Sequence, residues 1–148
     1  MTLVSTRRRA IRSSIALGAS LLLPHARACE FFTTSLRITH PWTRATAEGE
    51  QFAVVNMRFD EVTRADRLIG AETPVAERAE MGGTAAGPTV DFPVPEGQES
   101  SLSESSTFLR LVGLRFPLLA GREFPLKLVF EQSGAVATTL TVDYVRFK

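Results

Sequence analysis

The sequence LSESSTFLRLVGLRFPLL, from Leu102 to Leu119, decides the fold of this chain. Its centre alternates with a period of two residues, which is typical of a β-strand. Leu109 and Leu111 then lie on one face and are expected to pack in a hydrophobic core. Phe108 and Arg110 lie on the other face. The function therefore depends on what the ring of Phe108 and the guanidinium group of Arg110 contact.

The rest of the chain shows similar short alternations. Clear ones cover residues 52–59, 124–130 and 136–142, and Ser133-Gly134 between the last two indicates a hairpin turn. Residues 82–88 begin with two glycines and are expected to form a flexible loop. No apolar stripe has a helical period. Seven or more short strands without a helical crossover predict an all-β fold, an antiparallel Greek-key sandwich or barrel.

The N-terminal residues have the pattern of an export signal. Four arginines lie between positions 7 and 12, a short apolar segment covers residues 15–23, and Ala26-Arg27-Ala28 has the form of a cleavage motif. The apolar segment is too short to remain in a membrane as a helix. We expect residues 1–28 to be removed and residues 29–148 to form one periplasmic domain without a transmembrane segment. The alternative is a cytosolic protein with an amphipathic N-terminal helix.

Removal of the signal changes the charge of the chain. Five of the 17 basic residues precede position 29 and all 16 acidic residues follow it, so the net charge falls from +1 to −4. A mildly acidic domain with scattered arginines lacks the basic surface that nucleic acid or anionic lipid requires. Cys29, the only cysteine, would begin the mature chain. We expect it to remain a free thiol, and lipid anchoring is the alternative.

Residues able to carry chemistry are few. The only histidine after the signal is His40, next to Pro41-Trp42, and packing against the aromatic ring is its expected role. The chain has no glycine-rich phosphate loop and no nucleophile motif, so we expect a protein that is not an enzyme. Soft ligands for a metal are limited to Cys29, His40, Met57 and Met81. Met57 shares a strand face with apolar neighbours and is expected in the core.

A series of short motifs runs through the mature chain in order. They are Pro41-Trp42-Thr43-Arg44-Ala45, residues 65–71 (ADRLIGA), Thr73-Pro74-Val75-Ala76, Val94-Pro95, residues 111–114 (LVGL), Pro117-Leu118 and residues 124–130 (FPLKLVF). In this order and spacing they resemble the PCuAC family of periplasmic copper chaperones. The resemblance implies a cupredoxin-like β-sandwich, and it covers nearly the whole mature domain.

In that family, two histidines and two methionines hold copper. The resemblance places the first His–Met pair on Gly82 and near Thr84. It places the second pair on Phe108 and Arg110. None of these side chains is a copper ligand, and Arg110 brings a fixed positive charge. At about 4 Å, a charge of that sign costs a bound monovalent cation roughly 4 kcal/mol at an effective dielectric near 20.

Two hypotheses follow. In the first, this is an exported copper-chaperone-family protein with a degenerate metal site, and Gly82, Thr84, Phe108 and Arg110 form a surface for a periplasmic protein partner or an anionic ligand. The alternative for that surface is that Phe108 only fills the space left by the lost metal site. In the second, copper is still carried to a partner such as a respiratory oxidase, through a relocated site that involves Met81, with His40 as a further candidate ligand. The sequence indicates no cofactor other than copper.

Overall fold

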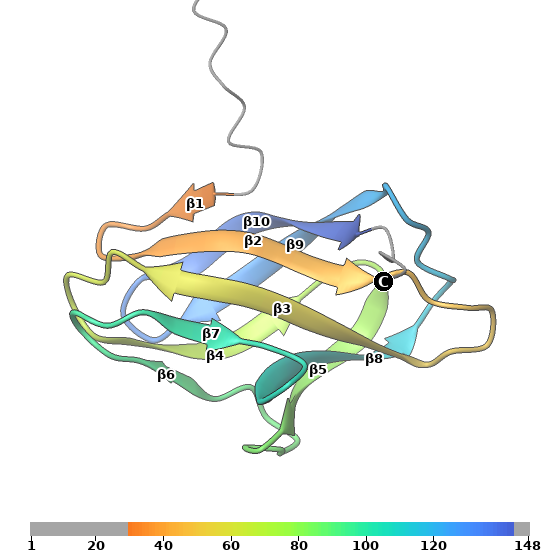
Figure 1. The fold of residues 1–148 in the computed structure, drawn as a ribbon, viewed down its shortest axis with the longest axis horizontal. Helices are drawn as coiled ribbons and strands as arrows, with labels where there is room; N and C mark the ends of the chain where they lie inside the picture. The colour runs from red at the N-terminus through yellow and green to blue at the C-terminus, as the bar shows by residue number, and fades with distance from the viewer. Residues whose placement is uncertain (1–29, 144–148) are drawn as a thin grey trace, which may run out of the picture.

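The computed structural model describes residues 30–143, which form ten β-strands and no helix (Figure 1). The strands are β1 (Glu30–Phe32), β2 (Arg37–Arg44), β3 (Phe52–Asp60), β4 (Asp66–Glu72), β5 (Ala76–Gly83), β6 (Phe92–Val94), β7 (Ser100–Leu102), β8 (Thr107–Leu114), β9 (Glu123–Phe130) and β10 (Gly134–Asp143). The expected export signal, its cleavage site and Cys29 lie outside the described residues.

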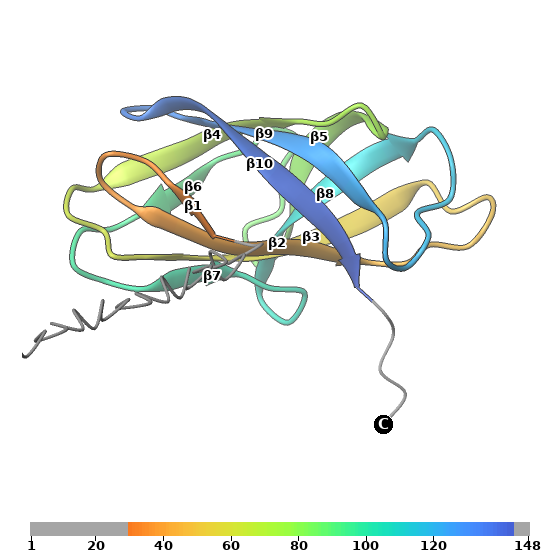
Figure 2. The ribbon, with the colours of Figure 1, turned by 90° about the horizontal axis from the view of Figure 1, so that it is seen from above.

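The strands join into one curled sheet. Their order is β5-β8-β3-β2-β10-β9-β4-β6, with β1 added beside β2 and β7 beside β3. Figure 2 shows β2 and β3 in one layer and β4 and β9 in the other, with β10 running diagonally between the layers. The predicted all-β, cupredoxin-like fold is confirmed. All strand pairs are antiparallel except β2–β10, which is parallel and which the sequence did not indicate.

The core lies between the two layers, and the alternation read from the sequence fills it. On β8, Leu109 and Leu111 are fully buried, as predicted. On β3, Val55, Met57 and Phe59 face the same core. Met57 therefore packs as an apolar side chain, and its expected place in the core is confirmed. Burial of such side chains is the main favourable term that holds a sheet of this kind together.

Three features differ from the sequence prediction. The strand β5 continues through Gly82 and Gly83, so the loop expected at residues 82–88 begins only after them. The strands β1 and β7 have three residues each and carry no alternation long enough to be recognised. All three features depend on strand pairing, which brings distant parts of the chain together.

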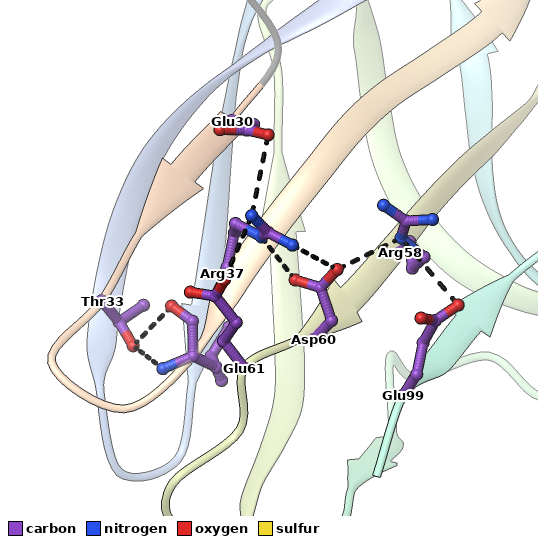
Figure 3. Close-up of polar contacts among 8 residues, drawn as sticks. Glu30, Thr33, Arg37, Arg58, Asp60, Glu61 and Glu99 are labelled. Carbon is purple, nitrogen blue, oxygen red and sulfur yellow. Dashed lines mark hydrogen bonds and ion pairs between the residues drawn. The ribbon is translucent and has the colours of Figure 1, made fainter. Parts of the chain in front are cut away.

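An ion-pair cluster around Arg37 fastens the first strand to the sheet (Figure 3). Arg37 Nε and Nη2 donate to the carboxylate of Asp60 at 2.6 and 2.9 Å, and Nη1 lies 3.8 Å from Glu30 and 3.2 Å from Glu61. The hydrogen bond to Asp60 raises the pKa of Arg37 above its ordinary value, and the same bond lowers the pKa of Asp60. The cluster joins β1, β2, the end of β3 and the residue after it.

Asp66 closes the turn between β9 and β10. Its carboxylate accepts hydrogen bonds from the backbone N–H groups of Arg67, Gln132 and Ser133 at 2.8, 2.8 and 3.0 Å, and from Ser133 Oγ at 2.6 Å. Burial raises the pKa of Asp66, but these bonds outweigh it, so the pKa lies below its ordinary value. The acidic residue of the ADRLIGA motif therefore has a structural role.

Candidate functional site

The strands β5 and β8 bring together the positions that the sequence singled out. In their antiparallel register Gly82 lies opposite Phe108, and Glu80 lies opposite Arg110. The backbone N–H of Thr84 donates to the carbonyl oxygen of Ser106 at 3.1 Å, which holds Thr84 at the same end of the strand pair. The four positions therefore share one region of the surface.

The ring of Phe108 lies directly over Gly82. A Cβ atom placed on Gly82 would be 2.2 Å from Cε2 of this ring and 2.7 Å from Cζ, far inside van der Waals contact. Gly82 has no positive φ, so the backbone itself would accept a side chain. The glycine is required because the ring occupies the space that any side chain at position 82 would need. A histidine at this position and the ring in its present place exclude each other.

Arg110 is held by two neighbours. Its Nε donates to Glu80 Oε1 at 2.8 Å, and Nη2 bonds the same carboxylate. Its guanidinium group also lies 5.2 Å from the ring centroid of Phe52, within the range of a cation–π interaction. The Glu80–Arg110 pair carries no net charge. Glu80 also lies 3.9 Å from Nη2 of Arg78, so one carboxylate faces two arginines. The sequence estimate of roughly 4 kcal/mol took Arg110 without a partner, and the pairing with Glu80 reduces it.

The donor set at these positions does not fit a copper ion. Copper in proteins takes thiolate, thioether and imidazole ligands, and the four positions supply a glycine, a threonine hydroxyl, a phenyl ring and a guanidinium group. Within residues 30–143, no three side chains of the His, Cys, Asp and Glu types gather as metal ligands.

The two residues considered for a relocated site lie apart. Met81 pairs with Leu109 and is 1% exposed, so its side chain belongs to the core face rather than to the face of Gly82. His40 lies at the surface, where Nε2 is 3.1 Å from Oδ2 of Asp143 and the ring stacks on Trp42 with centroids 6.3 Å apart. The structure does not bring Met81 and His40 together.

Comparisons with known proteins agree with this architecture. The family model with the description "Putative lipoprotein LpqE-like" matches residues 36–142. The chain belongs to the LpqE-like family. A comparison with curated proteins finds no match to it.

No helix in the described part of the chain has the length and apolar character needed to cross a membrane.

Solved structures place this LpqE-like chain with PCuAC domains. The copper-bound PCuAC domain from PmoF2 is 26% identical, with a TM-score of 0.70 over 77% of this chain and 97% of that domain. The apo PCuAC domain from PmoF1 is 25% identical, with a TM-score of 0.70 over 77% and 98%. The Cu(I) form of DR1885 from Deinococcus radiodurans is 18% identical, with a TM-score of 0.62 over 82% and 85%, and shows the fold alone. The resemblance to the PCuAC family is confirmed.

Sequence reasoning missed two residues of this site. Glu80 and Phe52 fix the guanidinium group of Arg110 from either side. Glu80 precedes Gly82 by two residues, and residues two apart on a strand point to the same face. The alternation in the sequence could therefore have placed Glu80 on the face of Gly82. The register between β5 and β8 is not visible in the sequence, because a connection of more than twenty residues separates the two strands.

Proposed function

We propose that this LpqE-like protein is an exported, non-enzymatic binding or accessory protein in which the metal site of PCuAC-type domains has become a contact surface for a periplasmic protein. The observation that carries this proposal is the phenyl ring of Phe108 over Gly82, which takes the space that any side chain at position 82 would need. In this proposal the absence of a histidine at position 82 and the presence of the Phe108 ring go together, because the ring leaves room only for glycine at that position.

The surrounding side chains have the character of an interface anchor. Phe52 is 52% exposed and lies beside Arg110. Phe108, on β8, is partly buried. Aromatic and arginine side chains are the residue types enriched at protein interfaces and their energetic centres. Glu80 holds the guanidinium group in one orientation, so Arg110 loses little conformational entropy when a partner binds. This arrangement favours a contact surface over a space-filling role for Phe108.

Replacement of Phe52 by serine tests the surface, because this ring is largely exposed and its loss leaves the core intact. The proposal predicts that Phe52→Ser weakens capture of a partner from periplasmic extract by at least about tenfold, as expected for an aromatic anchor. The midpoint of thermal unfolding should change little. Phe32→Ser is the matched control, since Phe32 is 61% exposed on β1, outside the β5–β8 surface. An equal loss in both variants would show non-specific apolar adhesion and contradict the proposal.

Export is the second part of the proposal. The basic, apolar and small-residue pattern of residues 1–28 supports it, and the description of the family as lipoproteins is consistent with it. Mass spectrometry of the protein from the periplasmic fraction should give a chain that begins at Cys29. A mass increased by acyl groups would establish the lipid anchor, and recovery of the full chain from the cytosol would contradict export.

Copper carriage is the second candidate function, because the similar PCuAC domain from PmoF2 is copper-bound. In this chain it would require Met81 to leave the core, since its side chain is 1% exposed beside Leu109. The hypothesis predicts tight Cu(I) binding that Met81→Ala abolishes. Competition for Cu(I) with a chelator of known affinity distinguishes it from the first proposal.

A further inference from the structure

A cavity of about 370 Å³ lies between β4 and β5, where strand pairing does not close the curled sheet. These two strands follow each other through residues 73–75 (Figure 1), but β4 pairs with β9 and β6, whereas β5 pairs only with β8. Four buried apolar residues form part of the cavity lining, namely Ala71, Ala76, Val90 and Leu111. None of the four positions of the contact surface lines this cavity, so the two regions are separate.

Along this cavity β5 has an open edge. In an antiparallel pair, every second residue points its N–H and C=O groups at the partner strand, and the residues between point theirs the other way. Met81 uses these groups on the side away from β8, where it exchanges two backbone hydrogen bonds with Gly87 at 3.0 and 3.1 Å. Alternation directs the backbone groups of Ala79 and Glu77 to the same side. Among residues 30–143 no strand pairs with them there, so two donors and two acceptors remain available.

The side chains around the open edge indicate what an added strand would carry. Ala79 contributes only a methyl group to the lining, and Ile69, on the β4 side of the cavity, is 45% exposed. An aliphatic side chain opposite Ala79 would fill this apolar space. Glu77 lies two residues from Ala79 on the same face of β5, is exposed, and has no ion pair among the described residues. Its carboxylate is therefore available to a cation.

The charges on the outer face of β5 do not oppose an added strand. A row of like charges on an edge strand prevents pairing with another chain. On β5, Arg78 lies 3.9 Å from Glu80, and Glu80 also bonds Arg110 of β8. Opposite charges therefore alternate on this face, and the one unpaired charge of the edge is the carboxylate of Glu77. The edge selects a basic segment over an acidic one.

We propose that the open edge of β5 binds an extended peptide segment of a partner protein as an additional strand. The backbone of the segment pairs with Glu77 and Ala79, as in other cases of strand addition to a sheet edge. An aliphatic side chain opposite Ala79 enters the cavity, and a lysine or arginine opposite Glu77 meets its carboxylate. The recognised pattern is thus an aliphatic and a basic residue separated by one residue, with the aliphatic residue first in an antiparallel strand.

A short peptide with blocked ends, Thr-Ile-Thr-Lys-Thr, tests the proposal by amide-resolved NMR of the mature protein. In a titration up to about 5 mM, which detects millimolar affinity, the backbone amide signals of Glu77 and Ala79 should shift saturably. The same peptide with an N-methylated isoleucine keeps every side chain but loses the N–H that donates to Ala79. It should bind about fivefold more weakly, the value of one hydrogen bond. Equal binding of the two peptides, or no saturable shift with either, would overturn the proposal.

Two variants of the protein test the edge from the other side, after thermal unfolding has established that each is folded. Ala79→Pro removes the N–H at the open edge but no bond to β8, and should weaken binding at least about fivefold.

Glu77→Lys should reverse the preference, so that Thr-Ile-Thr-Glu-Thr binds better than the lysine peptide. Glu123→Lys, exposed on β9 outside the cavity, is the matched control and should keep the original preference. An unchanged preference in Glu77→Lys would overturn the proposal. Sedimentation should show a monomer, and a dimer that Ala79→Pro dissociates would assign the edge to a second copy of the chain and overturn it as well.

Discussion

Gly82→Ala tests whether Phe108 has taken the space of a side chain at position 82. Gly82 has no positive φ, so alanine meets no backbone strain there. Without the ring, the substitution would stabilise a strand by about 0.5–1 kcal/mol, because glycine loses more conformational entropy on folding. With the ring present, the new Cβ would lie 2.2 Å from Cε2 of Phe108.

The overlap between the new Cβ and the ring of Phe108 decides whether Gly82→Ala stabilises or destabilises the protein. Overpacking of this kind costs about 1–3 kcal/mol. The ring is partly exposed and relieves some of the overlap by turning toward solvent, so the net loss of stability should be about 0.5–2 kcal/mol. For a domain of this size that corresponds to a fall in the unfolding midpoint of roughly 2–8 °C.

A double-mutant cycle isolates the contact. Gly82→Ala is measured by urea unfolding in the original chain and again in Phe108→Ala, where the ring is absent. In the second background the same substitution should be neutral or stabilising, giving a coupling free energy of about 0.5–3 kcal/mol. Gly87→Ala is the matched control, because a Cβ at Gly87 meets no atom within 4 Å and its φ is not positive. A coupling below about 0.5 kcal/mol would refute the packing of Phe108 on Gly82.

Two further substitutions test the surrounding structure. Gly83→Ala should destabilise the protein by about 3 kcal/mol, because φ at this position is +76° and the new Cβ would lie 1.9 Å from the carbonyl oxygen of Ser106. Phe108→Ala should not restore the lost stability. Asp66 has a lowered pKa in the folded state, so its stabilisation is present above the ordinary aspartate pKa and is lost as the pH falls through the folded pKa. Asp66→Asn should therefore lower stability at pH 7 by about 1–3 kcal/mol and flatten the acid side of the stability profile, as measured by urea unfolding at a series of pH values; an unchanged acid side would contradict this role.

The predicted fold rests on strands whose alternation is local. In β8 the leucines at 109 and 111 alternate with Phe108 and Arg110, and burial follows that pattern. The three-residue strand β7 escaped prediction because residues 100–102 are two serines and a leucine, which become a strand only by pairing with β3. The parallel β2–β10 pair joins segments about one hundred residues apart, and no local pattern encodes it.

Sequence reasoning selected Gly82 and Phe108 as parts of one surface. The register of β5 and β8 places them opposite each other, with the ring over the glycine. The charge of Arg110 was misjudged because its partner, Glu80, is set by the register between two strands distant in sequence.

The central claim is that the copper-type site of this LpqE-like protein has become a packed, ligand-free surface. Competition for Cu(I) between the mature protein and a chelator of known affinity tests it most directly. The triple variant Gly82→His, Phe108→His, Arg110→Met returns imidazole and thioether donors to three of the four positions and serves as the positive control. We predict no competition by the original protein and a gain of Cu(I) binding by the triple variant. Nanomolar or tighter Cu(I) binding by the original protein, abolished by Met81→Ala, would contradict the claim.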